Sequence, residues 1–259
     1  MITIKKLEEI EIMRQGGQIL AQCLVELQQR VVEGTRVKDL DTFARTFLEK
    51  HGGRPAFLGY GQSRRSPAYP ATLCVSINDE VVHGIGTRDI VIRDGDIVGL
   101  DIGVQYPAQN GLFTDMAVTV GVGAISDKAK NLIADTKKSL EEAIQQVRAG
   151  AFVHDISKTI QHYCESRGYG VVRDLTGHGV GYAVHEDPPI FCYYDPRMPK
   201  VQLAEGMVIC IEPMVTLGTW QVNVDPDRWT IRTADGSWAA HFEHTIAVTK
   251  SGYDILTRF

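Results

Sequence analysis

Gly95-Asp96-Ile97-Val98-Gly99-Leu100-Asp101-Ile102-Gly103-Val104 is a run of apolar and β-branched residues that is typical of a buried strand. A second run of this kind, Thr114-Asp115-Met116-Ala117-Val118-Thr119-Val120, follows a turn-forming Asn110-Gly111 dipeptide. The two runs predict a β-hairpin over residues 95–120. Each run carries one aspartate, Asp101 or Asp115, where a strand usually carries another aliphatic residue.

The two aspartates admit two interpretations. Each could lie at a strand end, in water or as a turn cap. Alternatively, both are buried; buried carboxylates on adjacent strands repel each other and are costly unless a cation lies between them. The hairpin alone does not decide between these interpretations.

The pattern of the first half of the chain occurs again in the second half. Helices expected over 12–30 and 39–51 precede the hairpin, and helices expected over 129–148 and 156–167 follow it. In each copy a glycine, Gly34 or Gly150, is followed five positions later by an aspartate, Asp39 or Asp155. We expect each aspartate to cap the next helix. Residues 205–215 resemble residues 94–104, and residues 242–248 resemble residues 114–120.

This duplication predicts the fold. We expect one catalytic domain over 1–259, of α/β (α+β) type, with two pseudo-symmetric halves at roughly 12–125 and 126–250. A central antiparallel sheet would have helices outside it. Glu212 then matches Asp101, and Glu243 matches Asp115. Four carboxylates would converge, which favours the cation interpretation and calls for about two divalent ions.

Three histidines accompany the carboxylates. His178 lies in Gly177-His178-Gly179, where flanking glycines allow close backbone approach, and His185 follows seven residues later. His83, in Val82-His83-Gly84, has a comparable place in the first half. A single histidine is more often an ordinary core or surface residue, but beside a carboxylate cluster a neutral imidazole is a natural ligand. His244 follows Glu243 directly, so on a strand it would point the other way.

Composition narrows the class of protein. The 259 residues are 44% hydrophobic and 23% charged, with a net charge of −5, which is ordinary for a soluble domain. The mild acidity gives no sign of a nucleic-acid or membrane surface. The five cysteines are scattered without a C-x-x-C motif, so we expect reduced thiols. No apolar run reaches the length of a membrane span or signal core, so we expect a cytoplasmic protein.

Six motifs resemble those of the type I methionine aminopeptidases. They are Leu100-Asp101-Ile102-Gly103, Thr114-Asp115-Met116-Ala117, Gly177-His178-Gly179-Val180-Gly181, Val184-His185-Glu186-Asp187-Pro188, Ile211-Glu212-Pro213 and Phe242-Glu243-His244-Thr245. The resemblance spans nearly the whole chain and implies the pita-bread (creatinase/aminopeptidase) fold.

The resemblance also implies roles for individual residues. The metal ligands would be Asp101, Asp115, His178, Glu212 and Glu243, with Asp115 and Glu243 bridging two divalent ions (Co, Mn, Fe, Ni or Zn). Glu212 would act as proton shuttle, His185 would stabilise the oxyanion, and His83 would hydrogen-bond near the scissile amide. The methionine pocket would draw on Tyr60, Tyr69, Cys74 and Trp229, with Phe57 and Val184 as weaker candidates.

The implied activity is removal of the initiator methionine from nascent polypeptides, preferably before a small second residue, by a monomer without membrane contact. A proline-directed aminopeptidase or prolidase is the nearest alternative. Those enzymes usually carry an additional N-terminal domain, whereas the repeat here begins almost at Met1. A metal-free binding protein on the same fold is a second alternative, but such relatives typically lose ligands.

Two segments depart from the family pattern. The loop 61–69 and the hairpin tip 105–113 are longer than usual, and the first weakens the assignment of Tyr69. The first loop contains Arg64-Arg65, which admits contact with ribosomal RNA, although an ordinary solvated surface loop is the favoured interpretation. A eukaryotic-type zinc-binding extension and the long insertion of type II enzymes are both missing from the sequence.

Overall fold

The computed structural model describes residues 1–62 and 67–258. Within those ranges the helices are α1 (Leu7–Gln28), α2 (Val37–Lys50), α3 (Asp127–Ile144) and α4 (Val153–Glu165). The strands are β1 (Arg54–Pro55), β2 (Leu73–Ile77), β3 (Glu80–Val82), β4 (Ile97–Tyr106), β5 (Leu112–Gly121), β6 (Gly170–Val171), β7 (Gly177–Gly179), β8 (Glu186–Ile190), β9 (Val208–Ile211), β10 (Met214–Thr216), β11 (Val222–Val224), β12 (Ile231–Thr233), β13 (Ala239–His241), β14 (Glu243–Val248) and β15 (Tyr253–Ile255).

One antiparallel sheet dominates the molecule. Its strand order is β1-β4-β5-β14-β9-β7-β8, with β2 paired to β4 and β15 paired to β14. The predicted hairpin is β4 and β5, which pair from Ile97↔Gly121 to Tyr106↔Leu112. Two smaller three-stranded sheets, β13-β10-β6 and β11-β12-β3, lie beside it. The antiparallel central sheet with outer helices is therefore confirmed.

The two halves of the chain meet at the pair β5–β14 in the middle of this sheet. Register places Glu243 opposite Ala117 and His244 opposite Met116. The Thr245 hydroxyl accepts from the Asp115 amide at 2.9 Å and donates to the Asp115 carbonyl at 2.7 Å. The Thr245 side chain thus extends the hydrogen bonding between β5 and β14 beyond their paired residues. It fixes the contact between the two halves beside Asp115.

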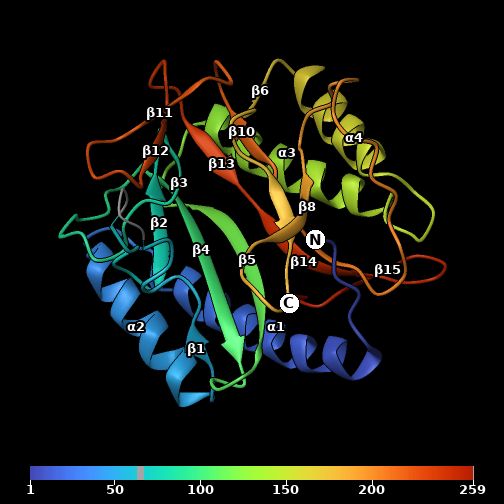
Figure 1. The fold of residues 1–259 in the computed structure, drawn as a ribbon. Helices are drawn as coiled ribbons and strands as arrows, with labels where there is room; N and C mark the ends of the chain where they lie inside the picture. The colour runs from blue at the N-terminus through green and yellow to red at the C-terminus, as the bar shows by residue number, and fades with distance from the viewer. Residues whose placement is uncertain (63–66, 259) are drawn as a thin grey trace.

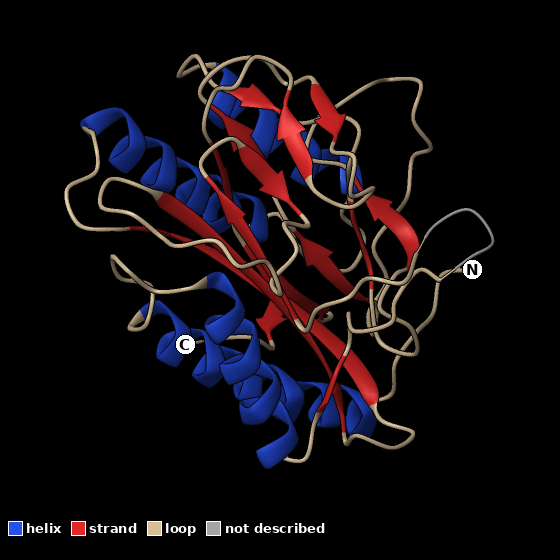
Figure 2. Ribbon diagram, turned by 90° about the vertical axis from the view of Figure 1, so that its left-hand side faces the viewer, coloured by secondary structure: helices blue, strands red, loops and turns tan. Residues whose placement is uncertain are grey.

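The helices pack in two pairs, α1 with α2 and α3 with α4, as Figure 1 shows at the lower and upper right parts of the molecule. Figure 2 shows the helices lying along the long strands of the sheet. One large core cluster runs between helices and sheet. It includes Leu24 of α1, Leu100 and Met116 of the hairpin, and Ile160 of α4.

Equivalent glycines in the two halves share a backbone conformation. Gly34 and Gly150, which precede α2 and α4, both have φ of 88°. Gly95 and Gly206, which precede β4 and β9, have φ of 89° and 84°. These left-handed values favour glycine. The local chain path therefore repeats where the sequence pattern repeats.

The predicted helix starts need correction. Asp39 and Asp155 do not cap α2 and α4, because these helices begin at Val37 and Val153, and both aspartates lie in the first turn. Asp155 Oδ2 instead accepts from the Phe152 amide at 3.0 Å, reaching back to a group that the helix leaves unpaired. Helix α1 begins at Leu7 rather than Ile12.

The cysteines agree with the expectation of free thiols, since all five are buried and unpaired in disulfides. Among the helices of the described residues, none combines the length and apolar character needed to cross a bilayer.

Candidate metal centre

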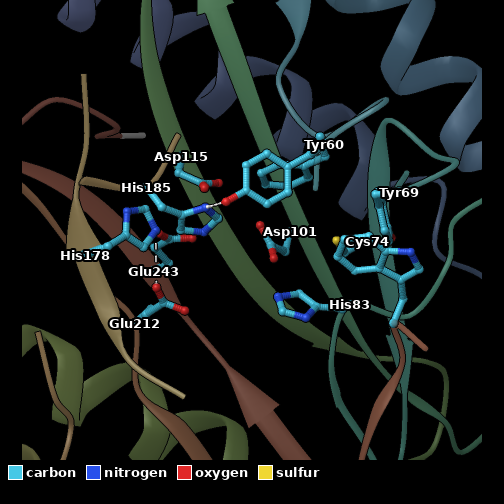
Figure 3. A pocket seen from close by; sticks show the side chains of 12 residues that line it. Tyr60, Tyr69, Cys74, His83, Asp101, Asp115, His178, His185, Glu212 and Glu243 are labelled. Atoms are coloured by element: carbon cyan, nitrogen blue, oxygen red, sulfur yellow. Dashed lines mark hydrogen bonds and ion pairs between the residues drawn. The ribbon is translucent and has the colours of Figure 1, made fainter. Parts of the chain in front are cut away.

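A pocket lined by residues from both halves of the chain lies at the sheet. Figure 3 shows its side chains, with Asp115, Glu212 and Glu243 on one side, Tyr69 and Cys74 on the other, and Asp101 between them. It is lined by Phe57, Tyr60, Tyr69, Cys74, His83, Asp101, Asp115, His178, His185, Glu212, Trp229 and Glu243. The structure therefore brings together in one place the residues proposed from the sequence as ligands, catalytic groups and pocket walls.

Strand register explains why three carboxylates and one thiol meet. Cys74 of β2 pairs with Asp101 of β4, Asp101 pairs with Ala117 of β5, and Ala117 pairs with Glu243 of β14. Side chains of directly paired residues project from the same face of a sheet. Asp115 lies two residues before Ala117 and shares that face. One row across four strands thus joins an acidic cluster to Cys74.

The acidic cluster has the donors of a cation site. Asp101, Asp115 and Glu243 each offer an oxygen, and these atoms all lie within 4.8 Å of one another. Glu212, directly after β9, places Oε1 3.5 Å from His178 Nε2. Oxygen and imidazole donors together suit a range of divalent transition metals.

Burial makes these carboxylates hard to ionise without a cation. It raises the pKa of Asp101, Glu212 and Glu243 well above their usual range, and the negative charge of neighbouring carboxylates raises them further. Burial raises the pKa of Asp115 to about 7. In the described residues, Asp101 Oδ1 and Glu243 Oε1 are buried and have no hydrogen-bond partner. A divalent cation would satisfy both oxygens, so the residues present fit a metal.

His178 is oriented by its neighbours. A Cβ on Gly177 would lie 2.4 Å from the Cys210 carbonyl oxygen, and one on Gly179 would lie 2.2 Å from that of Asp187. Only glycine allows the strand this close to its neighbours. His178 Nδ1 lies 2.9 Å from the Gly179 carbonyl oxygen, which can only accept. Nδ1 therefore carries the proton, and Nε2 turns its lone pair toward Glu212.

The other two predicted histidines line the pocket beyond the carboxylates. The His185 ring meets the His178 ring edge-on, with ring centroids 4.3 Å apart. The Nδ1 atom of His185 lies 2.6 Å from the Tyr60 hydroxyl. His83 has a left-handed backbone with φ of 60°. Burial, and then the neighbouring His185, lower the pKa of His83 to about 4, so its imidazole is neutral at physiological pH.

One residue of the site, His241, was not assigned from the sequence. Its Nε2 is buried, lies 3.6 Å from Glu212 Oε2, and has no hydrogen-bond partner among the described residues. The available signal was its position two residues before Glu243, since alternate strand residues share a face. His244 instead contacts the Thr257 hydroxyl through Nδ1 at 2.9 Å.

The apolar side of the pocket is built from aromatic edges. Tyr69 meets Trp229 with ring centroids 5.2 Å apart and Phe57 at 6.5 Å, both edge-on. Val184 and Cys74 are buried in the same cluster. The Tyr69 hydroxyl donates to the Gly84 carbonyl at 3.0 Å, which ties this wall to the turn of His83.

Of the two segments that are longer than the family pattern, the structure describes the hairpin tip in full but the loop 61–69 only in part. The hairpin tip lies between β4 and β5, away from Asp101 and Asp115, and both strands continue unbroken to it. Arg64-Arg65 lies outside the described residues.

Comparison with known proteins identifies relatives over the full length. The model of metallopeptidase family M24 matches residues 11–250. A "Methionine aminopeptidase" of Clostridium acetobutylicum is 44% identical over 258 residues, covering 99% of each chain. The crystal structure of the methionine aminopeptidase of Thermotoga maritima is 43% identical with a TM-score of 0.93, covering 100% of both chains. A Pyrococcus furiosus prolidase, 23% identical with a TM-score of 0.76, covers 99% of this chain but 65% of its own, and shares the fold.

Proposed function

The chain belongs to metallopeptidase family M24 and to its methionine aminopeptidases, and from this we propose that it removes the N-terminal methionine from polypeptides. The observation that carries the proposal is the row Cys74–Asp101–Ala117–Glu243, which sets an apolar pocket against a carboxylate cluster. A peptide whose first side chain enters the pocket would place its first carbonyl at that cluster.

The metal site we propose uses Asp101, Asp115, His178, Glu212 and Glu243, with Asp115 and Glu243 shared between two ions. Two bound divalent ions would polarise the carbonyl and supply a nucleophilic water at neutral pH. The orphaned oxygens of Asp101 and Glu243 support this assignment. Co, Mn, Fe, Ni and Zn all accept this donor set.

Glu212 is the group that we propose moves the proton. Its carboxylate lies within 4 Å of two imidazoles, those of His178 and His241. Burial raises its pKa, which suits a carboxylate that takes a proton from water and returns it to the leaving amine.

His185 and His83 are proposed to contact the substrate. When the Tyr60 hydroxyl donates to His185 Nδ1, the ring proton of neutral His185 resides on Nε2. That N–H would donate to the oxyanion of the tetrahedral intermediate. His83 faces Trp229, with ring centroids 6.5 Å apart, and would hydrogen-bond near the scissile amide.

The methionine side chain is proposed to lie against Tyr60, Tyr69, Cys74 and Trp229, with Phe57 and Val184 behind them. Sulfur–aromatic contacts are favourable, and an unbranched thioether adapts to an aromatic pocket. The edge-on contacts of Tyr69 support a rigid wall that selects shape.

Further expectations accompany the activity. We propose preference for a small second residue, a cytoplasmic location, action as a monomer on nascent chains, and two metals of unknown identity. Ribosome contact stays a hypothesis. If replacing both Arg64 and Arg65 with glutamate leaves ribosome co-sedimentation unchanged, that hypothesis is wrong.

The decisive test is peptide cleavage by chelator-stripped protein, with and without Mn or Co. The peptides are Met-Ala-Ser, Met-Lys-Ser, Leu-Ala-Ser and Ala-Pro-Ser. We expect metal-dependent release of methionine from Met-Ala-Ser alone. Cleavage of Ala-Pro-Ser instead would identify a proline-directed enzyme. Absence of cleavage with either metal would favour a binding protein on the same fold.

A further inference from the structure

The loop that carries His185 is short and has little regular structure of its own. Residues 180–185 connect β7, which bears His178, to β8, which begins at Glu186. Its backbone is fixed from outside by Phe113, whose amide donates to the Gly181 carbonyl at 2.7 Å. The Val180 amide donates to the Val208 carbonyl at 3.0 Å, and the Tyr182 hydroxyl donates to Glu9 at 2.8 Å. Between these contacts, the backbone just before His185 is held by one side chain, Glu186.

Glu186 binds the loop with one carboxylate oxygen and the N-terminal segment with the other. Its Oε1 accepts from the amides of Tyr182 at 2.5 Å and Ala183 at 3.0 Å. Its Oε2 accepts from Lys5 Nζ at 2.6 Å and from the Thr3 hydroxyl. Glu186 therefore joins the backbone two residues before His185 to the segment ahead of α1.

Lys5 is the cationic partner of Glu186, and its side chain is nearly inaccessible to solvent. Its side chain is 1% exposed and that of Glu186 is 7% exposed. The Lys5 amide donates to the Gly206 carbonyl at 2.8 Å, which fixes the segment to the turn before β9. A Cβ on Gly181 would lie 2.2 Å from Lys5 Cε, so the lysine stem packs directly against the loop backbone.

We propose that Lys5 is a positioning residue for the reaction: through its buried ion pair with Glu186 it holds the loop that aims the His185 imidazole into the pocket. The inference rests on the proposed function, because it assigns a remote residue to the group that would stabilise the oxyanion. Removing the ammonium leaves the buried carboxylate of Glu186 without its cation. The carboxylate would then turn toward water and release the amides of Tyr182 and Ala183.

The expected consequence is a loss in the chemical step. A displacement of a catalytic group by about 1 Å can cost on the order of 100-fold in rate. For Lys5→Met, which keeps the length of the stem, we expect kcat on Met-Ala-Ser to fall roughly tenfold or more, with KM changed by less than about threefold. Lys5→Gln, which keeps one hydrogen-bond donor, should fall between Lys5→Met and wild type.

Two control variants separate positioning from general damage. Lys6→Met removes a neighbouring lysine whose side chain is 75% exposed, and should leave kcat unchanged. Ile160→Val removes one methylene from a buried position on α4 and controls for lowered stability alone. Ile160 belongs to a different core cluster from the loop residues Val180 and Val184.

A double-mutant cycle tests whether Lys5 acts through Glu186. Glu186→Gln and Lys5→Met should each lower kcat, and the double variant should be no slower than the slower single variant, because both remove one interaction. Additive losses would overturn the proposal, as would wild-type kcat in Lys5→Met.

Nuclear magnetic resonance of chelator-stripped, ¹⁵N-histidine-labelled protein gives a readout that does not depend on turnover. In Lys5→Met the imidazole signals of His185, assigned with His185→Gln, should shift, while those of His51, directly after α2, stay in place. Unshifted His185 signals would overturn the proposal. If wild type cleaves no peptide, the proposed function fails, and this experiment still decides whether Lys5 positions His185.

Discussion

Glu212 lies between the imidazoles of His178 and His241, with N–O distances of 3.5 and 3.6 Å. Glu212→Gln keeps an oxygen that can bind a metal, but its amide cannot take up and release a proton. We expect kcat on Met-Ala-Ser to fall by about 100-fold or more, since general acid–base catalysis contributes about 10²–10⁴. Steady-state kinetics at saturating metal measures this, and circular dichroism should show an unchanged fold. A kcat within threefold of wild type would exclude Glu212 as proton shuttle.

Asp115 should make the stability of the metal-free protein fall as pH rises. Burial raises its pKa from the ordinary 3.8 to about 7, so the folded state binds this proton more tightly than the unfolded state. The stabilisation is complete below about pH 4 and is lost as pH rises through about 7. The Asp115→Asn variant has no carboxyl group at this position, so its stability does not fall with pH for this reason.

Urea unfolding of the two chelator-stripped proteins at pH 5 and pH 8 tests this prediction. The stability of Asp115→Asn relative to wild type should be greater at pH 8 than at pH 5. An equal difference at both pH values would contradict the raised pKa.

The carboxylates could be found from sequence because the duplication marks them twice, Asp101 with Glu212 and Asp115 with Glu243. His241 could not be assigned in this way. Its spacing from Glu243 indicates a shared face, but its contact with Glu212 depends on how the end of β13 packs against the end of β9.

At the scale of elements, a buried charge network supports the turn that carries His83. Glu80 of β3 is 3% exposed at its side chain and binds both Arg88 and Arg232, at 2.6 and 2.7 Å. Arg88 also donates to the carbonyls of Val75 at 2.7 Å and Ile85 at 2.9 Å. The guanidinium thus spans the turn on both sides of His83.

Arg88→Met should lower the free energy of unfolding by about 2–3 kcal/mol, because it breaks a buried pair and leaves Glu80 with one cation. Urea unfolding measures the change. The matched control is Arg45→Met on α2, whose partner Glu49 lies 3.0 Å away and where both side chains are more than half exposed. That variant should change stability by less than about 1 kcal/mol. Equal effects in the two variants would contradict a structural role for the buried network.

Long periodic elements were predictable, and their starts were not. Helices α1 to α4 follow from apolar spacing, yet Asp39 and Asp155 looked like caps because aspartate is common there. The actual starts depend on backbone geometry: Asp155 reaches back to the Phe152 amide from inside the first turn. Short strands such as β11 and β13 depend on tertiary pairing and left no periodic signal.

For the whole molecule, metal should act as a stabilising ligand. At a free Mn concentration about 100 times Kd, a single site adds about 2.7 kcal/mol to the free energy of unfolding. Thermal unfolding of chelator-stripped protein with and without Mn measures the gain. Glu243→Gln, which alters a proposed bridging ligand, should reduce it at the same Mn concentration. An identical gain in the variant would remove Glu243 from the ligand set.

The architecture was predictable as far as two similar halves sharing one sheet. Sequence similarity between the halves indicates equivalent elements, but it does not say which strands join them. In the structure β5 and β14 join the halves, and the Thr245 hydroxyl bonds both backbone groups of Asp115 beside this pair. Such a contact appears only in three dimensions.

The position of β14 between β5 and β9 has a consequence for how the molecule matures. A chain folded only as far as β5 has Asp101 and Asp115 but lacks His178, Glu212 and Glu243. Pairings between strands distant in sequence form slowly. If these five residues bind the metal as proposed, high-affinity ion uptake is expected only after the central sheet is complete. Molecules that hold the ions would then be those in which β14 has already paired with β5 and β9.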